Sequence, residues 1–234
     1  MTTRTGRPPS VFDRAFLSDS DEALEVLLIR HGQQVIDLDG PTGDLIDPPL
    51  SEQGRLQARL LGEALSTVHL DAVFASPLER ALRTAEAVAD QQRLDVQVID
   101  DLREVEIFRD VPDHQTPKEF FGTELLEAVR HRMLNERSWD VYPHSEPSHD
   151  FLKRSINAVE QAMATAKSGR IAVVCHGGVI NAYIGHIIAS PYDMFFRPAH
   201  TSVSVVLAGE SIRALRGLND THHLRTGEGD ATTY

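Results

Sequence analysis

The stretch Leu28-Ile-Arg-His-Gly32 ends an apolar run with an arginine, a histidine and a glycine. The run from Ala23 to Ile29 carries only one charged residue, Glu25, and is typical of a strand that is buried on both faces. Strands of this kind belong to mostly parallel sheets, and ligands of such sheets bind outside the carboxyl ends of the strands. We therefore expect Arg30 and His31 to lie at a ligand-binding edge of a sheet.

A second stretch of the same design appears later in the chain, as Ile171-Ala-Val-Val-Cys-His-Gly-Gly178. It predicts another buried strand that ends in a histidine, followed by a glycine turn and a buried helix. If the two strand ends meet at one sheet edge, His31 and His176 share a pocket. In such a pocket, fixed positive charge can hold an oxyanion while an imidazole nitrogen attacks phosphorus.

The remaining pattern alternates strands and helices, which predicts an α/β fold. We expect a three-layer αβα sandwich, a mostly parallel sheet with helices on both faces and a helical cap insertion. Strands are predicted at Ala72–Ala75 and Val96–Ile99, and helices at 51–68, 77–90 and 148–167. A hairpin is predicted from Ser202–Leu207 and Ser211–Leu215.

The chain is expected to form one domain over residues 21–234, preceded by a flexible arm over 1–20 that is rich in Thr, Pro, Ser and Asp. Residues 105–147 break the alternation and predict the cap, with an amphipathic helical segment from Lys118 to Leu134. The cap holds an unusually large share of the aromatic residues: Phe120, Phe121, Trp139 and Tyr142. They form either a small core within the insertion or part of a substrate pocket.

Composition narrows the class of protein. The chain has 234 residues and a formal net charge of −12, which argues against binding to nucleic acids or to anionic membranes. Its one cysteine, Cys175, excludes an intramolecular disulfide and fits a reducing compartment. The first residues lack the apolar core of a secretory signal, so we expect a cytoplasmic protein. The sequence leaves a homodimer open.

Five short motifs occur in order: Leu28-Ile-Arg-His-Gly32, Leu50-Ser-Glu-Gln-Gly54 with Gln57-Ala58, Ala75-Ser-Pro-Leu-Glu-Arg-Ala81 with Thr84-Ala85, Leu102-Arg-Glu104 and Val174-Cys-His-Gly-Gly178. Together they resemble the motifs of the histidine phosphatase superfamily, the phosphoglycerate mutase-like group, and its phosphatase branch in particular. The resemblance covers residues 24 to 178.

The resemblance implies a role for six residues. Catalytic roles fall to His31, a nucleophile that becomes a phosphohistidine, to His176, which stabilises developing charge, and to Glu104, the proton donor to the leaving oxygen. Phosphate-binding roles fall to Arg30 and Arg80, through their guanidinium groups, and to Gly177, through its backbone N–H. It implies neither a metal nor another cofactor, because fixed cations take that place.

The implied activity is metal-independent hydrolysis of a small phosphorylated metabolite. One alternative is phosphotransfer of the phosphoglycerate mutase type, which needs cations around a second phosphate. The basic residues of the cap are Arg109, Lys118, Arg130, Arg132 and Arg137. They are offset by acidic residues, which argues against a mutase: Asp110, Asp113, Glu119, Glu124, Glu127, Glu136 and Asp140. The other alternative is a catalytically weak member that binds phospholigands or protein partners, against which the intact set of site residues argues.

Some assignments stay open at the level of single residues. Glu106 lies two positions after Glu104 and would face the same side of an extended segment, although the motif favours Glu104. Cys175 should face the core, and Asn181 stands where a cysteine phosphatase would need an arginine. The remaining histidines, His222 and His223 among them, lack metal-ligand spacing and are interpreted as surface or structural residues.

The chain also departs from the family's pattern. Gln33, Gln34 and Asp37 replace residues that commonly follow the first motif, so a phosphate contact at position 37 is in doubt. Ser145-Glu-Pro-Ser148 stands in place of a Gly-Glu-Ser loop, and Gly217–Leu224 only suggests the Asn-Asp segment of some phosphatases.

Overall fold

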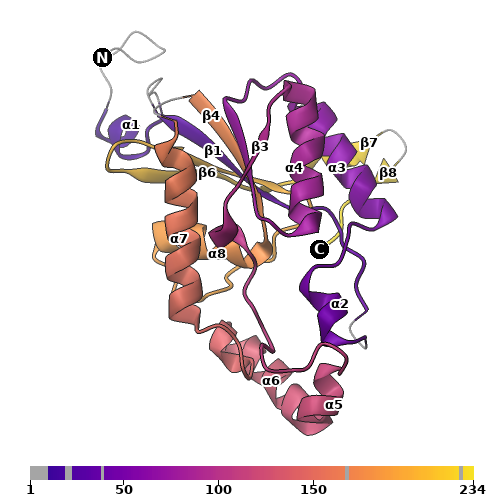
Figure 1. Cartoon of the computed structure of the whole chain (residues 1–234). Coiled ribbons are helices and arrows are strands. Elements are labelled where there is room, and N and C mark those ends of the chain that lie inside the picture. The colour runs from indigo at the N-terminus through magenta and orange to yellow at the C-terminus, as the bar shows by residue number, and fades with distance from the viewer. Residues whose placement is uncertain (1–9, 19–22, 38–39, 167–168, 227–228) are drawn as a thin grey trace.

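A six-stranded sheet forms the middle layer of the computed structural model, which describes residues 10–18, 23–37, 40–166, 169–226 and 229–234. The strand order is β3-β2-β4-β1-β5-β6 (Figure 1). The strands are β1 Leu24–Arg30, β2 Ala72–Ala75, β3 Val96–Val98, β4 Gly169–Cys175, β5 Val203–Ala208 and β6 Arg213–Asp220. The first four strands in this order are mutually parallel, and β5 runs antiparallel to both β1 and β6. The predicted mostly parallel sheet is confirmed.

Helices cover both faces of this sheet (Figure 1). Helices α3 (Glu52–Leu65) and α4 (Glu79–Gln92) lie on one face, and α7 (Ser148–Ala164) and α8 (Gly177–Ile188) on the other. Alternate residues of β1 serve the two layers, as the pleat of a strand requires. Leu27 and Ile29 pack with α3 and α4, whereas Val26 and Leu28 pack with α7 and α8. The predicted three-layer α/β fold is confirmed.

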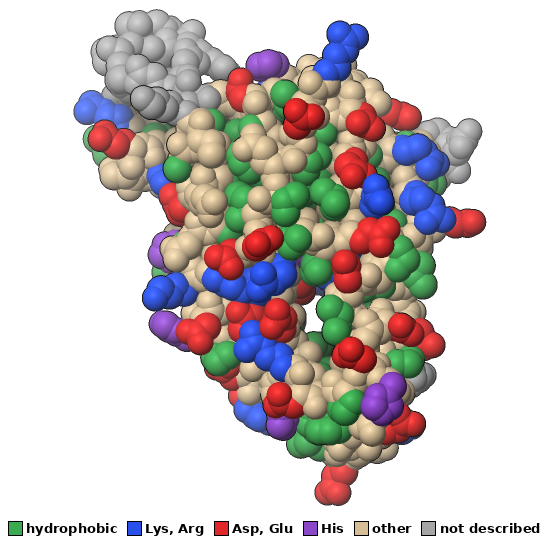
Figure 2. Space-filling view, in the orientation of Figure 1, with side chains coloured by type: hydrophobic (Ala, Val, Ile, Leu, Met, Phe, Trp, Pro, Cys, Tyr) green, Lys and Arg blue, Asp and Glu red, His purple; other side chains and the backbone are tan. Residues whose placement is uncertain are grey.

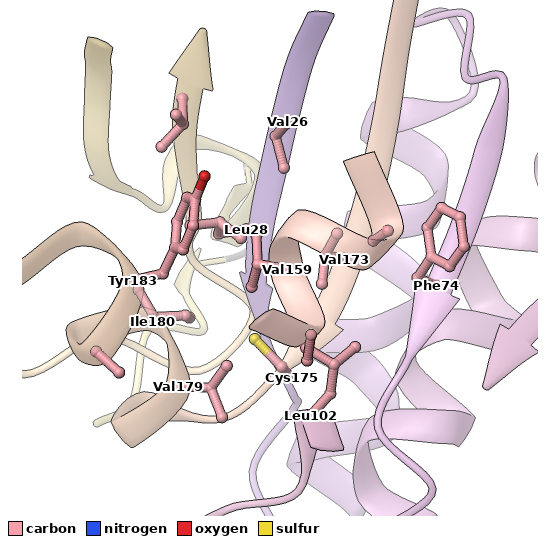
Figure 3. Close-up of a cluster of buried hydrophobic side chains, with 14 of the residues drawn as sticks. Val26, Leu28, Phe74, Leu102, Val159, Val173, Cys175, Val179, Ile180 and Tyr183 are labelled. Carbon is pink, nitrogen blue, oxygen red and sulfur yellow. The ribbon is translucent and has the colours of Figure 1, made fainter. Parts of the chain in front are cut away.

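The core under α7 and α8 contains the cysteine (Figure 3). Cys175 is fully buried beside Val179, on the face of β4 that also carries Val173. Burial raises the pKa of its thiol, so the side chain stays protonated and packs as a small apolar group. The interpretation of Cys175 as a core residue is confirmed.

The segment between β3 and α7 forms a separate lobe below the sheet (Figure 1). After a 3₁₀ turn, η1 (Asp100–Leu102), it holds α5 (Pro117–Phe121), α6 (Thr123–Glu136) and η2 (Trp139–Val141). The prediction of one continuous helical segment from Lys118 is wrong, because Gly122 adopts a φ of +80° and breaks it. A short helix after β1, α2 (Thr42–Ile46), contacts this lobe through the Thr42 N–H, which donates to the Gln115 carbonyl at 2.9 Å.

Most aromatic residues of the lobe pack on one another. Phe121 lies 5.5 Å from Phe108, and Trp139 lies 6.2 Å from Phe151 of α7, measured between ring centroids. These contacts support the interpretation of a small local core. Phe120 also packs on Phe121, with ring centroids 4.9 Å apart, but it remains 42% exposed.

Two terminal segments complete the described chain. Residues 10–18 include a short helix, α1 (Val11–Ala15), which begins at a capping box formed by Ser10 and Asp13. Residues 1–9 and 19–20 of the predicted arm lie outside the described residues, so its flexibility stays a prediction. At the other end, η3 (His222–Leu224) precedes a two-stranded ribbon of β7 (Arg225–Thr226) and β8 (Gly229–Asp230). No described helix is long and apolar enough to cross a bilayer.

Candidate active site

The carboxyl ends of β1 and β4 bring two histidines together. The strands pair in parallel with Arg30 opposite Cys175, and the next residue along each strand is a histidine. The backbone N–H of His31 donates to the Cys175 carbonyl at 3.0 Å, which continues the ladder past the strand end. The ring centroids of His31 and His176 are 5.0 Å apart, and both side chains are buried. The predicted meeting of the two strand ends is therefore present.

The hydrogen bonds of His31 define its tautomer. Its Nδ1 lies 2.7 Å from the Gly32 carbonyl oxygen, which can only accept, so Nδ1 carries the proton. Its Nε2 therefore holds the lone pair and accepts from Nε of Arg80 at 3.4 Å. Burial, with further contributions from His176 and the nearby guanidinium groups, lowers the pKa of His31 well below its usual range. The ring is neutral at neutral pH, with a lone pair available on Nε2.

The second histidine is held by a serine. Nε2 of His176 lies 2.8 Å from Oγ of Ser76, while its Nδ1 is buried and has no partner among the described residues. Burial, followed by the charges of Arg80 and Arg30, lowers the pKa of His176 as well. Gly177 opens α8 directly after it, beside the Arg30 side chain. Helix α4 begins at Glu79 with Leu78 as its N-cap, two residues later than the start predicted from the sequence.

Two arginines lie close to these histidines. Nη1 of Arg30 donates to the Pro198 carbonyl at 2.5 Å, while its buried Nε has no partner among the described residues. Arg80, in the first turn of α4, donates to the Ile46 carbonyl at 3.3 Å and pairs with Asp47 at 3.5 Å. Burial lowers the pKa of Arg30 to about 10 and also lowers that of Arg80. At neutral pH both remain cations in a poorly hydrated site, where their charge acts strongly.

Glu104 lies opposite the start of α8. Its Oε2 accepts from the Gly178 N–H and its Oε1 from the Val105 N–H, each at 3.0 Å. Any side chain at position 178 would collide with this carboxylate, which explains the second glycine of the motif. Glu106 instead lies exposed and pairs with Arg109 at 2.8 Å. The geometry thus places Glu104, and not Glu106, at the first turn of α8, where its charge acts on Arg30 and Arg80.

An arginine that the sequence analysis did not single out holds the Glu104 segment in place. Nε of Arg154, in α7, donates to Glu146 at 2.7 Å, and its Nη1 and Nη2 donate to the carbonyls of Arg103 and Glu104 at 2.8 and 3.0 Å. Glu146 belongs to the loop that departs from the family's pattern, and here it binds Arg154. No sequence pattern marks this contact, because its partners are distant in the chain.

A third histidine was also missed. His200 was among the histidines interpreted as surface or structural, yet it is 3% exposed and its ring centroid is 5.8 Å from that of His31. Its Nδ1 lies 2.8 Å from Oγ1 of Thr233, near the end of the described chain. His200 belongs to a loop without periodic apolar residues, so the sequence carries no signal for its burial.

The arrangement suits a tetrahedral oxyanion. Two guanidinium groups, two neutral imidazoles and a carboxyl group gather where two strands end and two helices begin. Some of their buried nitrogens have no partner within the described part of the chain. Figure 2 shows a hollow between the body that holds the sheet and the lobe of α5 and α6. No described residues form a group of three or more potential metal ligands. A fold and a site of this kind define an α/β enzyme that handles phosphate esters.

Comparison with known proteins makes the assignment specific. The sequence profile of the histidine phosphatase superfamily (branch 1) matches residues 26–221, so the chain belongs to this superfamily. It is 29% identical over 210 residues to phosphoserine phosphatase 1 of Hydrogenobacter thermophilus, covering 86% of this chain and 94% of that protein. It is also 29% identical over 210 residues to adenosylcobalamin/alpha-ribazole phosphatase of Escherichia coli, covering 84% and 96%.

A solved structure agrees with these relatives. The crystal structure of a putative alpha-ribazole-5'-P phosphatase from Escherichia coli superposes with a TM-score of 0.68 at 26% identity, covering 85% of this chain and 97% of that one. The predicted family, its phosphatase branch and the predicted enzyme class are confirmed. The roles of the individual site residues stay predictions.

Proposed function

We propose that the chain is a metal-independent phosphomonoesterase that acts on a small phosphorylated metabolite through a phosphohistidine at Nε2 of His31. The observation that carries the proposal is the tautomer of His31, because a neutral ring with its lone pair beside Arg80 is a ready nucleophile. Relatives that are named phosphoserine and alpha-ribazole phosphatases support a small metabolite as the substrate class.

In the first step, the lone pair of His31 Nε2 forms a bond to phosphorus and the bond to the ester oxygen breaks. Glu104, in its acid form, gives a proton to the leaving oxygen and becomes a carboxylate. Arg30 and Arg80 hold the phosphoryl oxygens, which suits planar guanidinium donors. His176 offers its unpartnered Nδ1 to the charge that develops on these oxygens.

In the second step, water attacks phosphorus and the bond to His31 breaks. The Glu104 carboxylate takes a proton from the water, so inorganic phosphate leaves and both residues return to their starting states. Gly177, at the start of α8, contributes its N–H and the positive end of the helix dipole to the bound phosphate.

Hydrolysis is favoured over transfer to a second phosphate site because several cations of the lobe are already engaged. Three interactions show this: Arg109 pairs with Glu106 at 2.8 Å, Arg132 pairs with Glu136 at 2.7 Å, and the guanidinium of Arg137 lies 5.1 Å from the ring centroid of Tyr192. A bisphosphorylated intermediate would need such cations free and directed at the pocket.

The test is phosphate release from a panel of aryl phosphates, phosphoserine and sugar phosphates, with and without a chelator. We expect turnover that a chelator leaves unchanged. The same preparation, given 3-phosphoglycerate and a bisphosphoglycerate primer in an enolase-coupled assay, should show negligible 2-phosphoglycerate formation. Primer-dependent turnover faster than phosphate release would replace the hydrolase by a mutase, and failure in both assays would favour a phospholigand-binding role.

A further inference from the structure

Hydrogen bonds to three distant segments hold the loop of His200 in place. Its loop is pinned to the end of β1, because the Thr201 N–H donates to the Arg30 carbonyl at 3.0 Å. The preceding N–H, of Ala199, donates to Oδ1 of Asn219 at 2.8 Å. The His200 backbone N–H donates to the Thr233 carbonyl at 2.9 Å, so both the backbone and the ring of His200 bind Thr233. The ring is therefore fixed beside that of His31.

A chain of hydrogen bonds with a defined direction leads to this ring. It begins at the Gln33 N–H, which donates to Oε1 of Gln57 at 2.9 Å and so fixes the orientation of that amide. Nε2 of Gln57 then donates to Oγ1 of Thr233 at 2.8 Å. The Thr233 hydroxyl proton has one acceptor among the described residues, Nδ1 of His200. When Nδ1 of His200 accepts this proton, each donor from Gln33 to Thr233 has an acceptor, and the other ring nitrogen is left without one among the described residues.

The consequence concerns the other ring nitrogen. Burial, together with the charges of Arg30 and Arg197, lowers the pKa of His200 to about 3, so the ring is neutral at neutral pH. A neutral ring whose Nδ1 accepts must carry its proton on Nε2. This Nε2 is buried and has no partner among the described residues. A bound oxyanion would supply the acceptor that this buried donor lacks.

We propose that His200 donates a hydrogen bond from Nε2 to a phosphoryl oxygen of the bound substrate, and that Thr233 is a positioning residue that holds His200 in this tautomer. The inference rests on the proposed phosphatase function. It adds a neutral donor to the two guanidinium groups, so it strengthens phosphate binding without adding charge. It also assigns a task to the segment around Thr233, which the sequence motifs do not cover.

Two substitutions at position 200 separate donation from packing. In His200→Gln the amide nitrogen can occupy the place of Nε2, whereas in His200→Asn it can occupy only the place of Nδ1. We expect His200→Asn to weaken kcat/KM and inhibition by phosphate or vanadate about tenfold, the effect of losing one hydrogen bond to a charged group. In His200→Gln, kcat/KM and the inhibition by phosphate or vanadate should both stay within about threefold of their values in the unaltered chain. Equal losses in both variants would overturn the proposal.

Thr233 offers a matched pair as well. Thr233→Val keeps the shape of the side chain but removes the hydroxyl, whereas Thr233→Ser keeps the hydroxyl. Nitrogen-15 NMR of labelled histidine reports the tautomer directly. We expect the Nε2–H tautomer of His200 in the unaltered chain and in Thr233→Ser, and a mixture of tautomers in Thr233→Val. An Nδ1–H tautomer in the unaltered chain would contradict the argument.

The NMR experiment also separates this inference from the proposed reaction. Titration with inorganic phosphate should shift the Nε2 proton of His200 whether or not the chain turns over an ester. A shift without any phosphoenzyme would leave the binding role intact and refute the reaction. Turnover through a phosphoenzyme, with a His200 signal that phosphate does not move, would refute the binding role alone.

Discussion

The pocket at the sheet edge and the lobe of α5 and α6 are built in opposite ways. In the pocket, His31, His176 and Arg80 are all less than a tenth exposed and are fixed by strand ends, a helix start and hydrogen bonds. In the lobe, α6 buries one residue, Val129, and carries surface ion pairs such as Arg132 with Glu136, which stabilise little. The difference leads us to expect that the proposed chemistry depends on the central sheet, and that changes in the lobe alter substrate preference more than the chemical step.

The largest effect should come from His31, the proposed nucleophile at the end of β1. His31→Ala should lower phosphate release by about 10⁴-fold or more, the order of loss seen when a catalytic nucleophile is removed. Circular dichroism and thermal unfolding should show a folded variant, because the residue lies at the end of its strand. Near-normal turnover by a folded His31→Ala would show that the reaction does not take place at His31.

The next effect distinguishes the two glutamates. Glu104→Gln should slow esters with poor leaving groups by about 10²- to 10⁴-fold, and activated aryl phosphates much less, because a good leaving group needs less protonation. Glu106→Gln is the matched control, since Glu106 pairs with Arg109 at the surface, and it should change either rate less than about threefold. A larger loss from Glu106→Gln than from Glu104→Gln would identify Glu106, at the edge of the lobe, as the proton donor.

The buried histidines should also make stability depend on pH. In the unfolded chain they take up protons near a pKa of about 6.5. In the folded chain burial lowers the pKa of His31 and His176, and that of His200 to about 3. The unfolded state then binds more protons below about pH 6.5, so stability is greatest above that pH and falls as the solution is acidified. Urea midpoints between pH 8 and 4.5 test this, and His200→Asn should flatten the dependence; a profile without slope would contradict the buried neutral rings.

The smallest effect should come from the lobe. Phe120→Ala removes a side chain that is 42% exposed and should raise KM for an aryl phosphate about threefold, with kcat unchanged. Phe121→Ala is the comparison, because Phe121 packs on Phe108 and His144 and its loss should lower the melting temperature instead. A fall in kcat from Phe120→Ala would instead show that the lobe contributes to the rate-limiting step and not only to substrate binding.

The sequence predicted what depends on local periodicity. The apolar run before Arg30 and the Cys-His-Gly-Gly stretch predicted two buried strands that each end in a histidine. The structure pairs these strands in parallel, which brings the two histidines together. Glu104 needed its motif as well, since the sequence alone could not separate it from Glu106. The structure separates them through the Gly178 N–H, a contact across 74 positions of the chain.

What the sequence could not predict depends on contacts between distant segments. Ser76 suits a helix N-cap by its position, yet its hydroxyl binds His176, a hundred positions away. The burial of His200 depends on Thr233 and on the end of β1, and no periodic pattern links these segments. A single glycine can be tolerated within a helix, so the sequence did not predict a break at Gly122. Its positive φ nevertheless ends α5 and precedes the start of α6.

The most direct test of the account is to trap the phosphoenzyme. Unaltered chain and labelled ester are mixed, quenched in base within milliseconds, and the phosphorylated residue is identified by mass spectrometry and phosphorus NMR. The account predicts an acid-labile phosphoramidate on Nε2 of His31, because Nδ1 is already bound to the Gly32 carbonyl. An acid-stable phosphoryl group, a phosphoryl group on another residue, or steady turnover with no phosphoenzyme at all would contradict it.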